Sequence, residues 1–205
     1  MRRRLMALKK SGGSVGLPDG YTAVNYIQSS GTQWIEMGVA PSQNTKVVLK
    51  IKINSLTNQG ASLIGSRTDL NSTDQFTTYL DNYGGSRFLF RVDGQTSATP
   101  FSGVKINTFY TVTLSASEMR FELEDGTIAF SSTFSVSEVT MALFKSKGVS
   151  GRGFLGKIYS CKHYNGDKLI QDFVPCLDSA GVPCMYDFVG KTAFYNQGTG
   201  SFTWG

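Results

Sequence analysis

Residues 46–54 alternate between apolar and polar side chains, and this pattern constrains the fold more than any other part of the sequence. The apolar positions are Val47, Leu49, Ile51 and Ile53, and the polar positions are Lys46, Lys50, Lys52 and Asn54. Successive side chains of a β-strand point to opposite faces of its sheet. The pattern therefore predicts a strand with one face in a hydrophobic core and the other in water.

The same two-residue period returns in later parts of the chain. Its inward positions are Phe88, Phe90 and Val92, then Tyr110, Val112 and Leu114, then Met119, Phe121 and Leu123. No stretch of helical length shows an apolar stripe at the helical period. Many short strands separated by turns predict an all-β fold, in which two antiparallel sheets pack as a sandwich.

Two dipeptides indicate tight hairpins between predicted strands. They are Asp125-Gly126 and Asn165-Gly166. Both central residues of such a turn adopt positive φ, which Asn, Asp and Gly tolerate best. With the second turn centred on Asn165 and Gly166, we expect Cys161 to lie opposite Ile170 in the paired strand.

The net charge of the chain is carried by its first ten residues. The chain has 20 basic and 15 acidic side chains, and this segment contributes five basic residues and no acid. Its cations are Arg2, Arg3, Arg4, Lys9 and Lys10. Residues 11–16 are rich in Gly and Ser, as flexible linkers are. We therefore expect a basic N-terminal arm with its linker over residues 1–16, and a folded domain over residues 17–205.

We expect this arm to dock on an acidic protein surface. Nucleic-acid phosphates and a membrane surface are the alternatives, because five cations in ten residues suit either. A membrane is not expected, since the arm has little apolar area to bury, and nucleic acid ranks behind docking on protein. The apolar stretch from Leu5 to Leu8 is shorter than the roughly 7–15 residues of a secretion signal, so export by the ordinary route is not expected.

The cysteines predict free thiols. Their number is odd, and Cys161, Cys176 and Cys184 lack the close paired spacing of a zinc site. Such thiols suit a protein that is assembled in a reducing cytoplasm.

Two parts of the sequence together resemble the two ends of a known type of domain. The first part is the stretch from Leu17 to Ile35. The second comprises Gly156–Lys162, Asp172–Cys176, Met185–Asp187 and Phe194–Asn196. They resemble the opening and the closing strands, respectively, of concanavalin A-like (laminin-G-like) jelly-roll domains of phages and prophages from gut bacteria. The resemblance implies a jelly-roll sandwich that spans the body of the chain and serves in surface recognition.

The resemblance also implies a biological context. We expect a non-enzymatic bacteriophage structural protein, a head decoration, tail or fibre component, that adheres to host or mucosal glycans. It would be assembled in the bacterial cytoplasm, form a homo-oligomer and bind other virion proteins through residues 1–16. The alternatives are a glycan-binding module of a bacterial surface or secreted protein and, more distantly, a glycoside hydrolase.

The loop from Asp81 to Arg87 contains the residue types of a glycan site. Tyr83 could stack on the apolar face of a sugar, and its hydroxyl groups could bind Asp81, Asn82 and Arg87. An ordinary connecting loop is the simpler interpretation of the same residues. Trp34 is expected in the core, and Trp204 either closes the sandwich or makes an exposed contact.

Catalysis and metal binding receive weaker support from the residues. Related hydrolases carry the pattern Glu-x-Asp-x-x-Glu on a concave strand. Glu122 and Glu124 lie on a predicted hairpin and depart from that pattern, so we expect them on a solvent-exposed strand face. His163 shares a strand face with Cys161 at about 6–7 Å, too far for a catalytic pair. We expect a half-buried histidine and inert thiols.

The loop carboxylates of Asp69, Asp74, Asp81 and Asp93 make calcium possible, and no other cofactor is expected.

Overall fold

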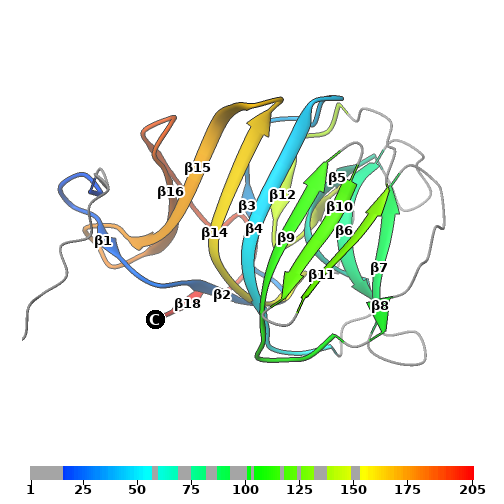
Figure 1. The fold of residues 1–205 in the computed structure, drawn as a ribbon. Helices are drawn as coiled ribbons and strands as arrows, with labels where there is room; N and C mark the ends of the chain where they lie inside the picture. The colour runs from blue at the N-terminus through cyan, green and yellow to red at the C-terminus, as the bar shows by residue number, and fades with distance from the viewer. Residues whose placement is uncertain are drawn as a thin grey trace, which may run out of the picture.

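The chain folds into two β-sheets that pack face to face (Figure 1). The structure is a computed structural model. It describes residues 16–56, 60–68, 75–81, 87–92, 101–102, 104–115, 118–123, 126–131, 138–148 and 153–205. Every regular element in these ranges is a strand, which confirms the predicted all-β sandwich.

The larger sheet has the strand order β11-β10-β9-β4-β14-β15-β16-β17, with β1 beside β15 and with β2 between β14 and β18. Its strands are β1 (Thr22–Ala23), β2 (Ile27–Ser30), β4 (Thr45–Ile53), β9 (Phe109–Ser115), β10 (Glu118–Leu123), β11 (Gly126–Ser131), β14 (Leu155–Asn165), β15 (Lys168–Leu177), β16 (Pro183–Asp187), β17 (Thr192–Phe194) and β18 (Thr203–Trp204). These strands cross the front of the molecule in Figure 1.

The second sheet lies behind the first, in the order β3-β12-β5-β6-β7-β8, and β13 pairs with β5. Its strands are β3 (Ile35–Glu36), β5 (Ala61–Arg67), β6 (Gln75–Asp81), β7 (Arg87–Val92), β8 (Phe101–Ser102), β12 (Ala142–Leu143) and β13 (Ser146–Lys147). Among the named strands, the pairing of β13 with β5 is parallel and all others are antiparallel.

The core fills the space between the sheets, and the alternation of β4 supplies its centre. All four predicted inward residues of β4 are fully buried, as are those of β9. They are Val47, Leu49, Ile51, Ile53, Tyr110, Val112 and Leu114. Full burial of one such side chain is worth about 1.5–3 kcal/mol, so this row strongly favours one register over a slip by one residue.

The β14–β15 hairpin differs in register from the prediction. Asn165 pairs with Lys168, so the turn residues are Gly166 and Asp167. Asn165 stays in its strand because it also pairs with Thr45 of β4. Gly166 has a φ of 60° and Asp167 is not among the residues with positive φ, which suits a turn with glycine in first place.

A β-bulge moves the same register further. His163 pairs with Gln171 and Tyr164 with Leu169, so Ile170 is the extra residue. Cys161 therefore lies opposite Phe173. The predicted partner, Ile170, is wrong. In the β10–β11 hairpin, Leu123 pairs with Gly126, so Gly126 belongs to the strand and not to the predicted turn.

Candidate functional site

A pocket with a volume of about 380 Å³ opens where two distant loops meet. One loop precedes β3 and the other follows β17, and residues from near β13 and β14 close the remaining side. The lining residues are Gly31, Thr32, Gln33, Trp34, Lys145, Gly153, Gln197, Gly198 and Thr199. This volume lies in the range of small-molecule binding sites.

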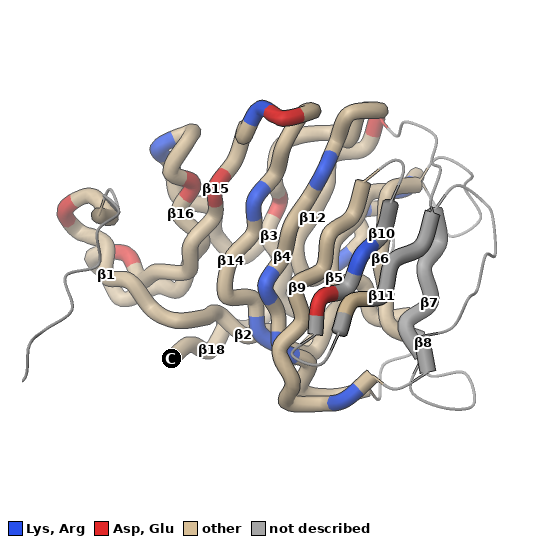
Figure 2. Tube along the Cα trace, viewed as in Figure 1, with Lys and Arg blue, Asp and Glu red and all other residues tan. Residues whose placement is uncertain are grey.

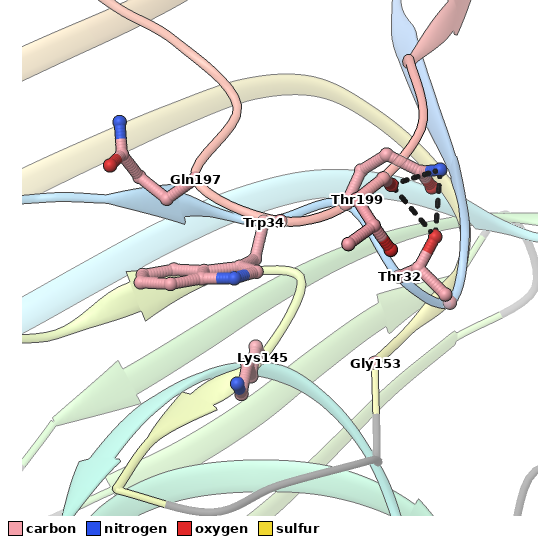
Figure 3. A pocket seen from close by; sticks show the side chains of 9 residues that line it. Thr32, Trp34, Lys145, Gly153, Gln197 and Thr199 are labelled. Atoms are coloured by element: carbon pink, nitrogen blue, oxygen red, sulfur yellow. Dashed lines mark hydrogen bonds between the residues drawn. The ribbon is translucent and has the colours of Figure 1, made fainter.

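Gln33 fixes the shape of the first loop. Its side chain is buried, and its amide nitrogen donates to the Thr32 hydroxyl at 2.9 Å and to the Thr199 carbonyl at 3.1 Å. The Thr32 hydroxyl donates to the same carbonyl at 3.0 Å (Figure 3). The amide oxygen of Gln33 accepts from the Ser30 backbone at 2.8 Å. Since both ends of this amide are used, Gln33 shapes the pocket and does not offer its amide to a ligand.

Asn196 fixes the second loop against the first. Its side-chain oxygen accepts from the backbone nitrogens of Trp34 at 3.1 Å and Gly198 at 2.9 Å. The Gln197 nitrogen donates to the Trp34 carbonyl at 2.8 Å. The loops touch so closely that a Cβ atom on Gly198 would lie 1.9 Å from the Thr32 carbonyl oxygen. Glycine is therefore required at this contact.

Trp34 lies in the wall of this pocket. It packs against the core but is only half-buried, so the prediction of a core residue is correct for part of its side chain. The amine of Lys145 lies 5.1 Å from the centre of the indole ring. Figure 3 shows the indole lying flat above Lys145, with Thr32 and Thr199 to one side.

The polar groups of the pocket suit a neutral, hydroxyl-rich ligand with an apolar face. The indole offers an apolar surface and an N–H donor, and the hydroxyl of Thr199 and the amine of Lys145 can bind hydroxyl groups. The side-chain nitrogen of Gln197 already donates to the Tyr195 carbonyl at 3.4 Å. No carboxylate is among the described lining residues, so they do not supply the paired acids of a glycoside hydrolase.

The predicted glycan loop is described only at its ends. Asp81 ends β6 and Arg87 begins β7, and the two are direct partners across the hairpin. Asn82 and Tyr83 lie outside the described residues. The prediction for this loop therefore stays a prediction, and the pocket at Trp34 was missed because its residues come from opposite ends of the chain.

The predicted carboxylates and metal ligands are only partly placed. Glu122 is exposed on β10, as expected for a solvated face, and Glu124 lies outside the described residues. Asp69, Asp74 and Asp93 lie outside them as well. In the described ranges, no group of three or more His, Cys, Asp and Glu side chains is arranged to hold a metal ion.

His163 is buried, and the prediction of a half-buried residue is wrong. It is 1% exposed because β14 lies in the middle of its sheet and is covered by the second sheet. The Gln171 amide nitrogen donates to the Met37 carbonyl, so the Gln171 oxygen accepts from His163 Nδ1 at 2.9 Å. Burial lowers the pKa of His163. The ring is therefore a neutral core group, away from the pocket at Trp34.

All three cysteines are free and buried, as predicted. Burial raises the pKa of Cys161, which keeps its thiol protonated and unreactive. Cys176 and Cys184 are direct partners across β15 and β16, with their sulfur atoms 3.3 Å apart. The sequence did not predict this pair, because the two residues meet only across neighbouring strands and no local sequence motif marks such a contact.

The arm cations Arg2, Arg3, Arg4, Lys9 and Lys10 lie outside the described residues, so their docking role is taken up as a proposal. Trp204 is 51% exposed on β18, which favours the exposed contact over a closing plug. Across the ranges given above, no helix combines the length and the apolar character that a membrane span requires.

No protein-family model and no curated protein matches the sequence. Among solved structures, the chain is similar to a proposed carbohydrate-binding protein from Bacteroides ovatus, with a TM-score of 0.53 and 10% sequence identity. The match covers 90% of this chain and 60% of that one. A second match is the heptameric SAP-like pentraxin from Limulus polyphemus, with a TM-score of 0.45, 10% identity and coverage of 74% and 78%.

The pentraxin match has a TM-score too low to support a statement about the fold. The match to the Bacteroides ovatus protein agrees with two packed antiparallel sheets, and at 10% identity it concerns the fold alone. Neither protein is described as a phage protein, so the predicted virion context has no support from them. This chain has the fold of a two-sheet antiparallel jelly-roll sandwich.

Proposed function

We propose that this protein is a carbohydrate-recognition module and that the pocket at Trp34 binds the sugar. The observation that carries the proposal is a partly exposed indole at the wall of a preformed pocket, next to a hydroxyl and an amine group. A sugar ring has one apolar face and a rim of hydroxyl groups, so it complements both parts of this surface.

The rigidity of the pocket favours binding without a large ordering cost. Its two loops are tied to each other by the side chains of Gln33 and Asn196 before any ligand arrives. A preformed site loses less conformational entropy on binding than a mobile one. The structural similarity to a proposed carbohydrate-binding protein supports the same function.

Replacing Trp34 by alanine tests this function. We expect the Trp34→Ala variant to bind its sugar about tenfold more weakly, because it loses the buried apolar area of the indole as well as about 1 kcal/mol of ring stacking. Ligands would be found on a glycan array with the full-length protein and their affinities measured by titration calorimetry.

Trp204→Ala is the matched control for this measurement. It removes a tryptophan that is 51% exposed and does not line the pocket, so its sugar affinity should equal that of the unmodified protein. Equal losses in both variants, or array binding that Trp34→Ala leaves intact, would refute the pocket as the sugar site.

We further propose that the module is a non-enzymatic component of a phage particle, attached through the basic arm of residues 1–16. The resemblance of its opening and closing segments to phage jelly-roll domains supports this context, as does the concentration of charge in the arm. A protein that lacks residues 1–16 should fail to co-purify with particles that incorporate the full-length chain. Incorporation of both forms would contradict docking through the arm.

A further inference from the structure

Three lysines and three aromatic rings form one continuous cluster on the outer face of the larger sheet. β4, β9 and β14 lie side by side there (Figure 2). The segment before β2 adds the ring of Tyr26 beside Tyr159. We call this surface the lysine–aromatic cluster. Its members are Tyr26, Lys50, Lys52, Phe109, Lys157 and Tyr159.

The rings of the cluster support the lysine amines. The Tyr159 ring lies 5.4 Å from Tyr26 and 4.9 Å from Phe109, centre to centre. The amine of Lys157 is 3.9 Å from the centre of the Tyr26 ring. Those of Lys50 and Lys52 are 5.1 and 4.9 Å from the centre of Phe109. Cation–π contacts of this kind hold the amines in place on the sheet.

The positive charge of the cluster is not compensated by its surroundings. Lys52 and Lys157 are direct partners across β4 and β14, a pairing of like charges that destabilises a sheet. Within the described part of the chain, none of the three amines forms an ion pair. By contrast, Lys162 on the same face pairs with Asp172 at 2.7 Å.

Among the side chains that the structure describes on this face, Glu122 is an exposed acid at some distance from the cluster. It pairs with Thr111, which in turn pairs with Lys50, so two strand spacings, about 10 Å, separate the two backbones. The cluster is thus a localised patch of three cations with an acid at its margin. Placing like charges together costs folding free energy, and a bound anion would recover that cost.

We propose that the lysine–aromatic cluster binds an acidic polysaccharide through the carboxylate or sulfate groups of that chain. The site is separate from the pocket at Trp34 and does not depend on the function proposed for that pocket. A polysaccharide is narrow and carries its charges at the spacing of its sugar rings, so successive anionic groups can reach the three amines along neighbouring strands.

The arrangement is less suited to nucleic acid. Amines occupy the ring faces, so few faces remain on which bases could stack. Duplex DNA carries one charge for each ~1.7 Å of its length and is wide. It would therefore cover Glu122 together with the lysines, and the carboxylate would repel its phosphates.

Charge-neutralising substitutions test this surface in the full-length protein. The cluster variant is Lys50→Gln, Lys52→Gln and Lys157→Gln together. The control variant is Lys105→Gln, Lys168→Gln and Lys191→Gln, which removes three exposed lysines elsewhere. Both lose the same charge and keep the same arm, so any difference between them belongs to the cluster. The probes are dextran sulfate, carboxymethyl dextran, neutral dextran and a DNA duplex, with affinity measured over a range of salt.

We expect the cluster variant to bind the two charged dextrans at least about tenfold more weakly than the control variant does. Its affinity should also depend less steeply on salt, since fewer counterions are released. Restoring the charge with arginine at the three positions should restore binding, and all variants should melt at similar temperatures. Binding of neutral dextran should be equal in the cluster and control variants, which separates the proposal from the sugar pocket.

Two results would overturn the proposal. In the first, the cluster and control variants bind the charged dextrans equally, so that the arm or the overall charge accounts for binding. In the second, the cluster substitutions weaken binding to the DNA duplex but not to the charged dextrans, which would assign the surface to nucleic acid.

Discussion

Alanine in place of Phe144 is expected to lower the free energy of unfolding by about 3–5 kcal/mol, a loss typical of phenylalanine truncation in a core. The ring is fully buried and lies 5.0 Å from Phe202 and 6.2 Å from Phe154, centre to centre. The backbone of the same residue joins β5 to the segment before β14, since its nitrogen donates to Leu63 and its carbonyl accepts from Phe154. A domain stable by 5–15 kcal/mol would lose a large share of its stability.

Glycine at the same position separates the contribution of the ring from that of the backbone. Phe144 has a φ of 66°, a left-handed conformation that costs an L-residue about 1–2 kcal/mol and glycine much less. Phe144→Gly should therefore be at least as stable as Phe144→Ala, although glycine is ordinarily the more destabilising replacement.

Urea unfolding of both variants measures these effects, with Ile106→Ala as the surface control. Ile106 is 50% exposed, and its truncation should change stability by no more than about 0.5 kcal/mol. A loss below about 1 kcal/mol in Phe144→Ala, at an unchanged denaturant slope, would contradict the role of this ring in the core.

The sequence predicted those strands whose side chains alternate between core and water. β4 and β9 could be read in this way because each buries one face only, which leaves a period of two in the sequence. β5 carries no such signal, since all its residues are buried and no alternation remains. Two-residue strands such as β1 and β18 have too few residues to carry any period.

Register was less predictable than the strands themselves. The Asn165-Gly166 dipeptide correctly marked a hairpin, but its position depended on pairing between Asn165 and Thr45, far apart in sequence. The bulge at Ile170 then changed every partner beyond it. The sequence of a hairpin does not indicate such contacts, because they depend on the neighbouring strand that pairs with the outer side of the hairpin.

The candidate site was predicted in its parts but not as a site. The two segments that carry the family resemblance include Trp34 and Asn196, and the structure joins them through a hydrogen bond of 3.1 Å. Their sequences alone gave no sign of this contact. Trp34 was placed in the core because of its apolar neighbours, a rule that does not distinguish a fully buried ring from one that also lines a pocket.

Gly198 makes the closest contact between the two loops of the pocket. A Cβ atom there would lie 1.9 Å from the Thr32 carbonyl oxygen and 2.8 Å from Cδ1 of Trp34. The carbonyl cannot move alone, because Thr32 is tied to the Thr199 carbonyl through its hydroxyl. Any side chain at position 198 must therefore push the two loops apart, and the indole with them.

Gly198→Ala is accordingly expected to weaken sugar binding more than Trp34→Ala does, because it displaces both loops and not one ring. Overpacking of this kind should also lower the free energy of unfolding by about 1–3 kcal/mol. Calorimetric titration and urea unfolding measure the two effects. Gly16→Ala is the matched control, since a Cβ at Gly16 meets no atom within 4 Å and both properties should stay unchanged. Unaltered binding in Gly198→Ala would mean that the close approach of the loops does not shape the sugar site.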